Sequence, residues 1–190
     1  MATVCAGAGA YASALAATWV GQITAVYCST EQKALDGAAL LAAYLGLPVS
    51  QVADLGENDR SATGYLSAPE FERVVDQFFA HPMVSIRGWE PAAVAQQRIV
   101  RAVTGLMAQE AAAHAIAIVA HGGVGTLLLC ALAGYAIDRR YEQPGTGGGN
   151  YYAFDAQAWV MRHGWRPIDI FEEGTGADGG PHAPRSWEPW

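Results

Sequence analysis

The apolar positions of this chain fall into short continuous runs and into runs with helical spacing. The segment Ala115–Ala120 is wholly apolar and contains three β-branched residues, which is typical of a buried strand. It stops at His121-Gly122-Gly123, and a second apolar run continues to Gly134 with the length of a helix. We expect this strand, glycine turn and helix to form the centre of the fold. We predict further strands at Ile23–Cys28 and at 49–55.

Two predicted helices flank the first of those further strands. Residues 9–20 have helical spacing, and Gly21 is suited to end the helix in a left-handed conformation. Ser29, with Gln32 three residues later, has the pattern of a capping box. The helix that this box would open ends at Gly46.

Ser67 and Glu70 give a second capping signal, ahead of a helix with one aromatic and aliphatic face. Segment 91–112 has the spacing of a long helix. Segments 151–154 and 159–162 predict two strands of a hairpin. Strands that alternate with helices imply an α/β layered fold with a largely parallel sheet.

The 190-residue length predicts one domain, which we assign to residues 1–171, with a disordered Gly/Pro-rich tail at 172–190. A net charge of -7 argues against nucleic-acid binding, and no apolar stretch has the length of a membrane span. The apolar start lacks the basic residues of a signal peptide, so we expect a cytoplasmic protein. Neither the three cysteines nor the five histidines have metal-ligand spacing, so we expect no metal and no cofactor.

The turn after the apolar strand is a candidate anion site, because amide N–H groups at a helix start attract negative charge. The amides of Gly122 and Gly123 are the candidate donors. His121 is suited to transfer a proton. Glu57 is a second candidate acid or base, and Arg60 and Lys33 are candidate anion-binding cations.

Each of these residues also has a structural interpretation. His121 can serve only as a helix cap, and Glu57 can pair locally with Arg60 in a solvated loop. Lys33 can simply be solvated. The pattern alone leaves both interpretations open.

Several segments together resemble the histidine phosphatase superfamily, which has the phosphoglycerate-mutase-like fold. Ala120 to Gly123 is similar to the second histidine motif of that family. Segment 28–34 resembles its strand-to-helix segment, in which a basic side chain reaches the phosphate. Leu55-Gly56-Glu57 lies where the family has an acidic residue after a strand, and segment 87–90 resembles its Gly-Glu-Ser region.

Gly149-Asn150-Tyr151 falls where a strand follows the family's second histidine helix. The resemblance implies a three-layer α/β fold with a mostly parallel sheet flanked by helices. We add Ser29 and Asn150 to the candidate substrate-binding residues on this basis. The ligand implied is an anionic small molecule.

The chain departs from the family at its first strand, which in the family ends in Arg-His-Gly and supplies the histidine that accepts phosphate. The first histidine of this chain is His81. In the preferred alignment the chain begins within the family's first helix, so that the fold is N-terminally abbreviated. In the alternative alignment, residues 3–6 are a remnant of the catalytic strand and Gly7 lies near the motif position. Neither alignment supplies the nucleophile.

Three hypotheses follow. The first is a divergent protein of this fold, repurposed for acid/base chemistry on an anionic small molecule by His121 and Glu57. The second is a non-catalytic pseudo-phosphatase that binds a ligand or partner, with a homodimer covering the sheet edge that an absent strand would expose. The third is a phosphatase or mutase whose start is truncated or misassigned.

Overall fold

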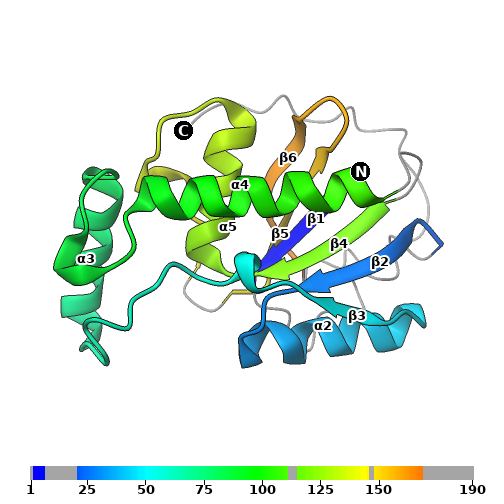
Figure 1. Cartoon of the computed structure of the whole chain (residues 1–190), viewed down its shortest axis with the longest axis horizontal. Helices are drawn as coiled ribbons and strands as arrows, with labels where there is room; N and C mark the ends of the chain where they lie inside the picture. The colour runs from blue at the N-terminus through cyan, green and yellow to red at the C-terminus, as the bar shows by residue number, and fades with distance from the viewer. Residues whose placement is uncertain (1, 7–20, 111–114, 146–147, 169–190) are drawn as a thin grey trace, which may run out of the picture.

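The computed structural model describes residues 2–6, 21–110, 115–145 and 148–168, and the side chains of 2–6 are not described. The described elements form one six-stranded sheet in the order β3-β2-β4-β1-β5-β6, with helices packed against it (Figure 1). They are β1 (Ala2–Ala6), β2 (Ile23–Cys28), α2 (Gln32–Leu45), β3 (Val49–Gln51), η1 (Ala53–Leu55), α3 (Ala68–Ala80), η2 (Ile86–Gly88), α4 (Ala92–Gln109), β4 (Ala115–Ala120), α5 (Gly122–Ala133), η3 (Arg139–Tyr141), β5 (Asn150–Asp155) and β6 (Val160–Pro167).

The sheet is mostly parallel, as predicted. Strands β3, β2, β4 and β1 pair in parallel. Strand β5 runs antiparallel to both β1 and β6, so it alone among the described strands is reversed. β5 and β6 form the expected hairpin.

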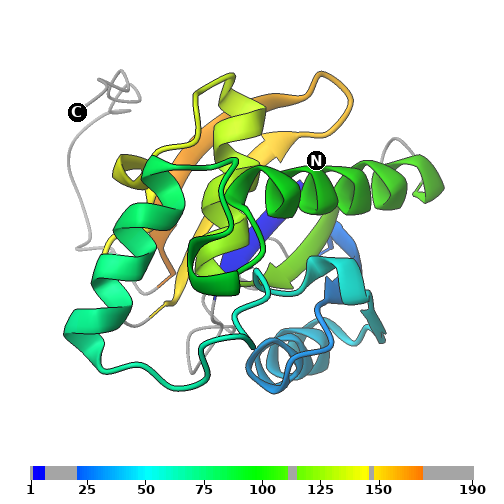
Figure 2. The ribbon, with the colours of Figure 1, turned by 60° about the vertical axis from the view of Figure 1, so that its left-hand side comes forward.

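Strand β4 explains the layered arrangement, because all six of its residues are buried. Successive side chains of a strand point to opposite faces. Ile116 and Ile118 accordingly pack in the core that includes α4 and α5, whereas Ala117 and Val119 pack in the core that includes α2. Figure 2 shows α2 and α4 on opposite sides of the sheet. The three-layer α/β prediction is therefore confirmed.

The helix ends agree with the glycine signals. Gly46 and Gly134 end α2 and α5 with φ values of 67° and 70°. Such left-handed angles favour glycine because it has no Cβ. The buried face of α3 consists of the predicted residues Val74, Val75, Phe78 and Phe79, with Phe71 partly buried.

The capping predictions are only partly right. Helix α2 begins after Glu31, not after Ser29. The Ser29 hydroxyl accepts from the Glu31 amide and also contacts His121. Ser67 does precede α3, but its side chain makes no capping hydrogen bond. Glu70 pairs instead with Arg87, 2.7 Å away.

The predicted strand at 49–55 is shorter than expected. It forms β3 over Val49–Gln51 and then turns into the short helix η1. The turn has a physical cause, because the carbonyl groups of Asp54 and Gly56 accept hydrogen bonds from Arg98 rather than from a neighbouring strand.

The preferred alignment of the chain start is wrong. Residues Ala2–Ala6 form β1, which fills the position between β4 and β5. The alternative alignment, with a strand at 3–6, agrees with the structure. The sheet therefore has no gap at this position, so the argument that a homodimer must cover an exposed central edge no longer applies.

Some predictions cannot be compared with the structure. The helix at 9–20 and the tail at 172–190 lie outside the described residues, as does the domain boundary after residue 171. Within the described parts of the chain, no helix is long and apolar enough to cross a membrane.

Candidate functional site

A cavity of about 270 Å³ lies where β4 gives way to α5, at the carboxyl end of the parallel strands. In open α/β sheets, ligands bind in this kind of crevice. Five of the predicted site residues line the cavity, namely Lys33, Glu57, Arg60, His121 and Gly122. Glu31 and Gln143, which the sequence analysis did not single out, line it as well.

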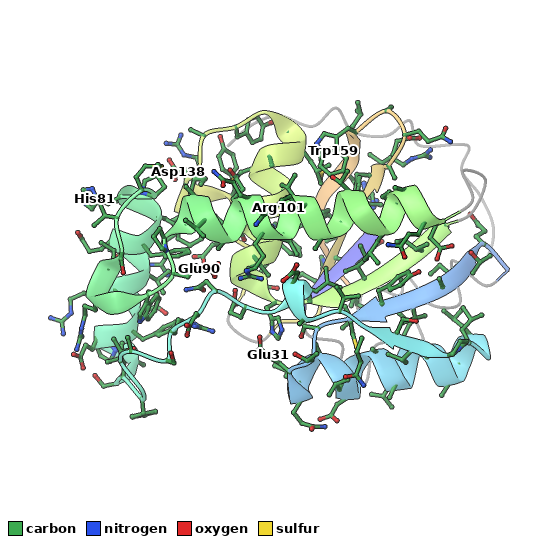
Figure 3. The ribbon with its side chains drawn as sticks, in the orientation of Figure 1. Glu31, His81, Glu90, Arg101, Asp138 and Trp159 are labelled. Carbon is green, nitrogen blue, oxygen red and sulfur yellow. The ribbon has the colours of Figure 1, made fainter. Side chains whose placement is uncertain are left out.

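His121 is held from one side by two polar groups. Its side chain is only 9% exposed, and its Nε2 lies 2.7 Å from the Ser29 hydroxyl oxygen and 3.3 Å from Glu31 Oε1. The Ser29 oxygen also accepts a hydrogen bond from the Glu31 amide, so its own proton is left to donate to Nε2 of a neutral imidazole. A protonated imidazole would instead donate from Nε2 to the Glu31 carboxylate. Figure 3 shows Glu31 where α2 begins.

Glu57 occupies the start of α5. Its Oε2 accepts from the Gly123 amide at 3.1 Å, and its Oε1 accepts from the Val124 amide at 3.0 Å. A third bond comes from the Asn58 amide at 3.1 Å. A carboxylate at this position is favoured by the helix dipole as well as by the amide N–H groups. The Gly123 amide, a predicted oxyanion donor, thus already donates to Glu57 in this structure.

Close packing explains the two glycines after His121. A Cβ on Gly123 would lie 2.6 Å from Glu57 Oε1, and a Cβ on Gly122 would lie 2.4 Å from Gln143 Nε2. Real Cβ atoms essentially never come so close to another heavy atom. The glycines thus allow Glu57 and Gln143 to approach the helix start.

Two cations line the cavity. Arg60 lies 3.9 Å from Glu57 Oε2, and its guanidinium carbon is 5.3 Å and 5.6 Å from the ring centroids of Phe71 and Trp89. Contact with the faces of aromatic rings stabilises a guanidinium and limits its motion. Lys33 makes no ion pair with any residue in the described part of the chain. Because it has no such partner, the Lys33 ammonium group is available to a ligand.

The loop that carries Glu57 is fastened by Arg98 of α4. The guanidinium uses all five of its N–H donors: two bind the Glu90 carboxylate at 3.0 and 2.8 Å, and the others bind carbonyl oxygens at 2.9, 3.0 and 3.2 Å. Those carbonyls belong to Asp54, Gly56 and Glu57. The hydrogen bond with Glu90 is the largest cause of a raised Arg98 pKa.

Glu90 secures the other side of the same loop. Its Oε2 accepts from the Asp59 amide at 3.2 Å, and its own amide donates to the Asp59 carbonyl at 2.9 Å. Glu90, in the segment that resembles the family's Gly-Glu-Ser region, therefore holds the loop in place and does not line the cavity. Arg98 has no local sequence signal, because its partners lie up to 44 positions away along the chain.

Asn150 is a buried residue that holds Gln143 and two nearby carbonyl groups. Its side chain is 3% exposed, and its amide nitrogen donates to Gln143 Oε1, to the Pro144 carbonyl and to the Gly148 carbonyl. Ser29 is fully buried beneath His121. Ser29 and Asn150 thus contact the lining residues His121 and Gln143 but are not among the residues that line the cavity.

Comparison with known proteins gives a family and a fold. The sequence model of the histidine phosphatase superfamily (branch 1) matches residues 6–164. Comparison with curated proteins gives no match. Among solved structures, YhfR of Bacillus stearothermophilus has a TM-score of 0.69 and 18% identity, and the alignment covers 86% of this chain and 94% of that chain.

Two named phosphatases are similar as well. A mycobacterial glucosyl-3-phosphoglycerate phosphatase has a TM-score of 0.59 and 21% identity, with 82% of this chain and 81% of that chain covered. The alpha-ribazole phosphatase of Shigella flexneri has a TM-score of 0.54 and 18% identity, with 80% and 90% covered. At such identities these structures show a shared fold. Because the family model spans more than half of the sequence, this chain belongs to the histidine phosphatase superfamily.

Proposed function

We propose that this protein is a divergent member of its superfamily that performs acid/base chemistry on an anionic small molecule without forming a phosphohistidine. The observation that carries the proposal is the shared cavity. His121 and Glu57 line it together with the two cations Lys33 and Arg60. An imidazole and a carboxylate supply proton transfer, and the cations supply binding of a negatively charged group.

The composition of β1 supports the part of the proposal that concerns phosphohistidine. Ala6 ends β1 and is level with Ala120, the residue before His121. The resemblance implies Arg-His-Gly at the end of this strand, but the chain has Cys5-Ala6-Gly7 there. Covalent phosphoryl transfer needs a nucleophile at that position. The chain's histidines lie at 81, 114, 121, 163 and 182.

The two acid/base candidates have different roles in this proposal. His121 exchanges a proton through Nε2, with Ser29 and Glu31 as its partners. Glu57 places a fixed negative charge beside Arg60, and its Oε2 accepts one amide bond where Oε1 accepts two. Oε2 is therefore the oxygen better placed to take a proton from a ligand.

The ligand class is supported by the neighbours and by the cations. Structures of the mycobacterial glucosyl-3-phosphoglycerate phosphatase hold vanadate and inorganic phosphate. Phosphate is therefore the first probe for this chain. We also include carboxylates, because a guanidinium binds both kinds of planar or tetrahedral oxyanion.

The test compares the full chain with His121→Asn. We expect the wild-type protein to bind inorganic phosphate in calorimetry and to turn over a member of a panel of phosphate and carboxylate esters. We expect His121→Asn to lower that turnover by at least about 100-fold, as removal of a general acid or base does. Equal turnover by the variant would refute the role of His121. Phosphate trapped covalently on a histidine after acid-free quenching would refute the second part of the proposal.

A non-catalytic binding protein is the second candidate, and one observation favours it. The reactive atoms of His121 and Glu57 are already paired within the protein, with Ser29 and Glu31 on one side and helix amides on the other. Phosphate binding without turnover of any ester on the panel, in a protein with a well-dispersed NMR spectrum, would establish this alternative.

A further inference from the structure

We infer that Gln143 is a ligand-binding residue, whose side-chain amide nitrogen donates to an oxygen of the anion bound in the His121 cavity. This inference rests on the proposed function, because it concerns the same cavity. Gln143 follows η3 and lines the same cavity as Lys33 and Arg60.

The orientation of the Asn150 side-chain amide is fixed by its neighbours. Its amide group lies 3.0 Å from the Pro144 carbonyl and 3.3 Å from the Gly148 carbonyl. Two carbonyl oxygens require a donor, so the atom facing them must be the amide nitrogen of Asn150. The hydrogen-bond network therefore settles an orientation that the shape of the side chain does not.

The orientation of Gln143 follows from that of Asn150. The nitrogen of Asn150 has two N–H groups for three acceptors, so one N–H is shared between two of them. The Gln143 atom that lies 3.2 Å from this nitrogen is therefore the acceptor Oε1. Nε2 then points the other way. Asn150 is 3% exposed and bound at three places, so it holds this orientation firmly.

Nε2 of Gln143 lies against the start of α5, 2.4 Å from where a Cβ of Gly122 would be. Gly122 and Gln143 both line the cavity. Nε2 makes no hydrogen bond to another residue among those described. A polar N–H group without a partner at the lining of a cavity is a suitable donor for a ligand oxygen.

Gln143 also supplies something that the cations do not. Glu57 has taken the amides of Gly123 and Val124, so the start of α5 does not offer these donors to an anion. Gln143 places a neutral, directional donor beside Gly122, the first residue of α5. Lys33 and Arg60 attract the charge, whereas Gln143 fixes the position of one oxygen beside His121.

The experiment measures inorganic phosphate binding by calorimetry for the full chain and four variants. Arg60→Ala removes one of the two cations of the cavity and tests the proposed function. Gln143→Glu keeps the shape of the side chain and replaces the donor by a second acceptor. Gly122→Ala keeps Gln143 and displaces its amide through the new Cβ. Gln109→Glu is the matched control, because it makes the same chemical change at an exposed residue that ends α4, at the opposite end of β4.

We expect Gln143→Glu to weaken phosphate binding by roughly tenfold to a hundredfold, because the hydrogen bond to the anion is lost and a negatively charged acceptor takes the place of the donor. Gly122→Ala should weaken it by about tenfold or more, and Gln109→Glu should not change it. Far-ultraviolet circular dichroism and amide NMR spectra establish that each variant is folded.

Different outcomes overturn different statements. If wild type binds phosphate, Arg60→Ala weakens binding and Gln143→Glu binds as wild type does, the assignment of Gln143 is wrong and the proposed function stands. If folded wild type binds neither phosphate nor any carboxylate probe, the anionic ligand of the proposed function is wrong, and the assignment of Gln143 falls with it.

Discussion

Replacement of Arg98 by alanine should loosen the loop that carries Glu57. The Arg98 side chain is 17% exposed, and it donates to three backbone carbonyls and to the Glu90 carboxylate. Each carbonyl bond contributes about 1 kcal/mol, and the half-buried ion pair contributes about 1 kcal/mol more. Water reaches part of the exposed backbone and offsets some of this sum. We therefore expect a loss of about 3 kcal/mol of unfolding free energy.

Urea denaturation measures this loss as a lower midpoint at an unchanged slope. For a chain of this length, 3 kcal/mol corresponds to a decrease in Tm of roughly 6–12 °C. Arg98→Lys should lose about half as much, because an ammonium group has three donors in place of five. The matched control is Arg101→Ala, at an exposed position on the outer side of the same helix (Figure 3), which should change stability by less than about 0.5 kcal/mol.

Amide hydrogen exchange separates loop positioning from general destabilisation. If Arg98 acts through Glu57, the Gly123 and Val124 amides should lose protection in Arg98→Ala well before the central strand β4 does. The reasoning is refuted if the loss is under about 1 kcal/mol, or if the two amides exchange no faster relative to β4 than in wild type.

Two further predictions concern single contacts. Gly123→Ala and Glu57→Ala should each lower the free energy of unfolding by about 1–2 kcal/mol. The double variant should lose clearly less than the sum, because removing the Glu57 carboxylate frees the space that a Cβ on residue 123 needs. Additive losses in urea titrations would contradict this contact. The hydrogen bond to Glu110 and burial raise the pKa of Tyr27 to about 12, so the folded state keeps this proton longer than the unfolded state, whose tyrosines titrate near 10. Stability should therefore fall between pH ~10 and ~12, and thermal melts of Tyr27→Phe should show a smaller fall; equal slopes would rule out the contribution of Tyr27.

The sequence predicted those elements whose burial pattern is local. Strands β2 and β4 have their predicted bounds. Every residue of β4 is buried, and a continuous apolar run in the sequence is the direct signal of such a strand. Strand β1 was harder to recognise, since ATVCA is short and an alanine- and glycine-rich segment follows it. Its identity as a strand depends on pairing with β4 and β5, which are more than 100 positions away.

The site was predicted in its composition but not in its contacts. Lys33, Glu57, Arg60 and His121 do line one cavity. The capping pattern at Ser29 placed the helix start too early, because Glu31 is the residue that precedes α2. The Ser29 hydroxyl accepts from the Glu31 amide and also contacts His121, a partner 92 positions away that the local pattern does not show. No sequence motif singles out Glu31, Arg98 or Gln143. Their contacts with His121, with the loop that carries Glu57 and with Asn150 are visible only in the folded structure.

The position of Glu57 changes the meaning of the strand–glycine–helix turn. Such a turn is a general anion site, and in this chain the anion at two of its amides is a side chain of the protein itself. A ligand that competed for those amides would have to displace a carboxylate that Arg98 holds through the backbone. We therefore expect a ligand to be bound by Lys33, Arg60 and Gln143, with Glu57 left in place as a negative charge. The cavity is thereby suited to an anion that also offers a proton or a donor group toward Glu57, since a ligand with acceptors alone would meet repulsion there.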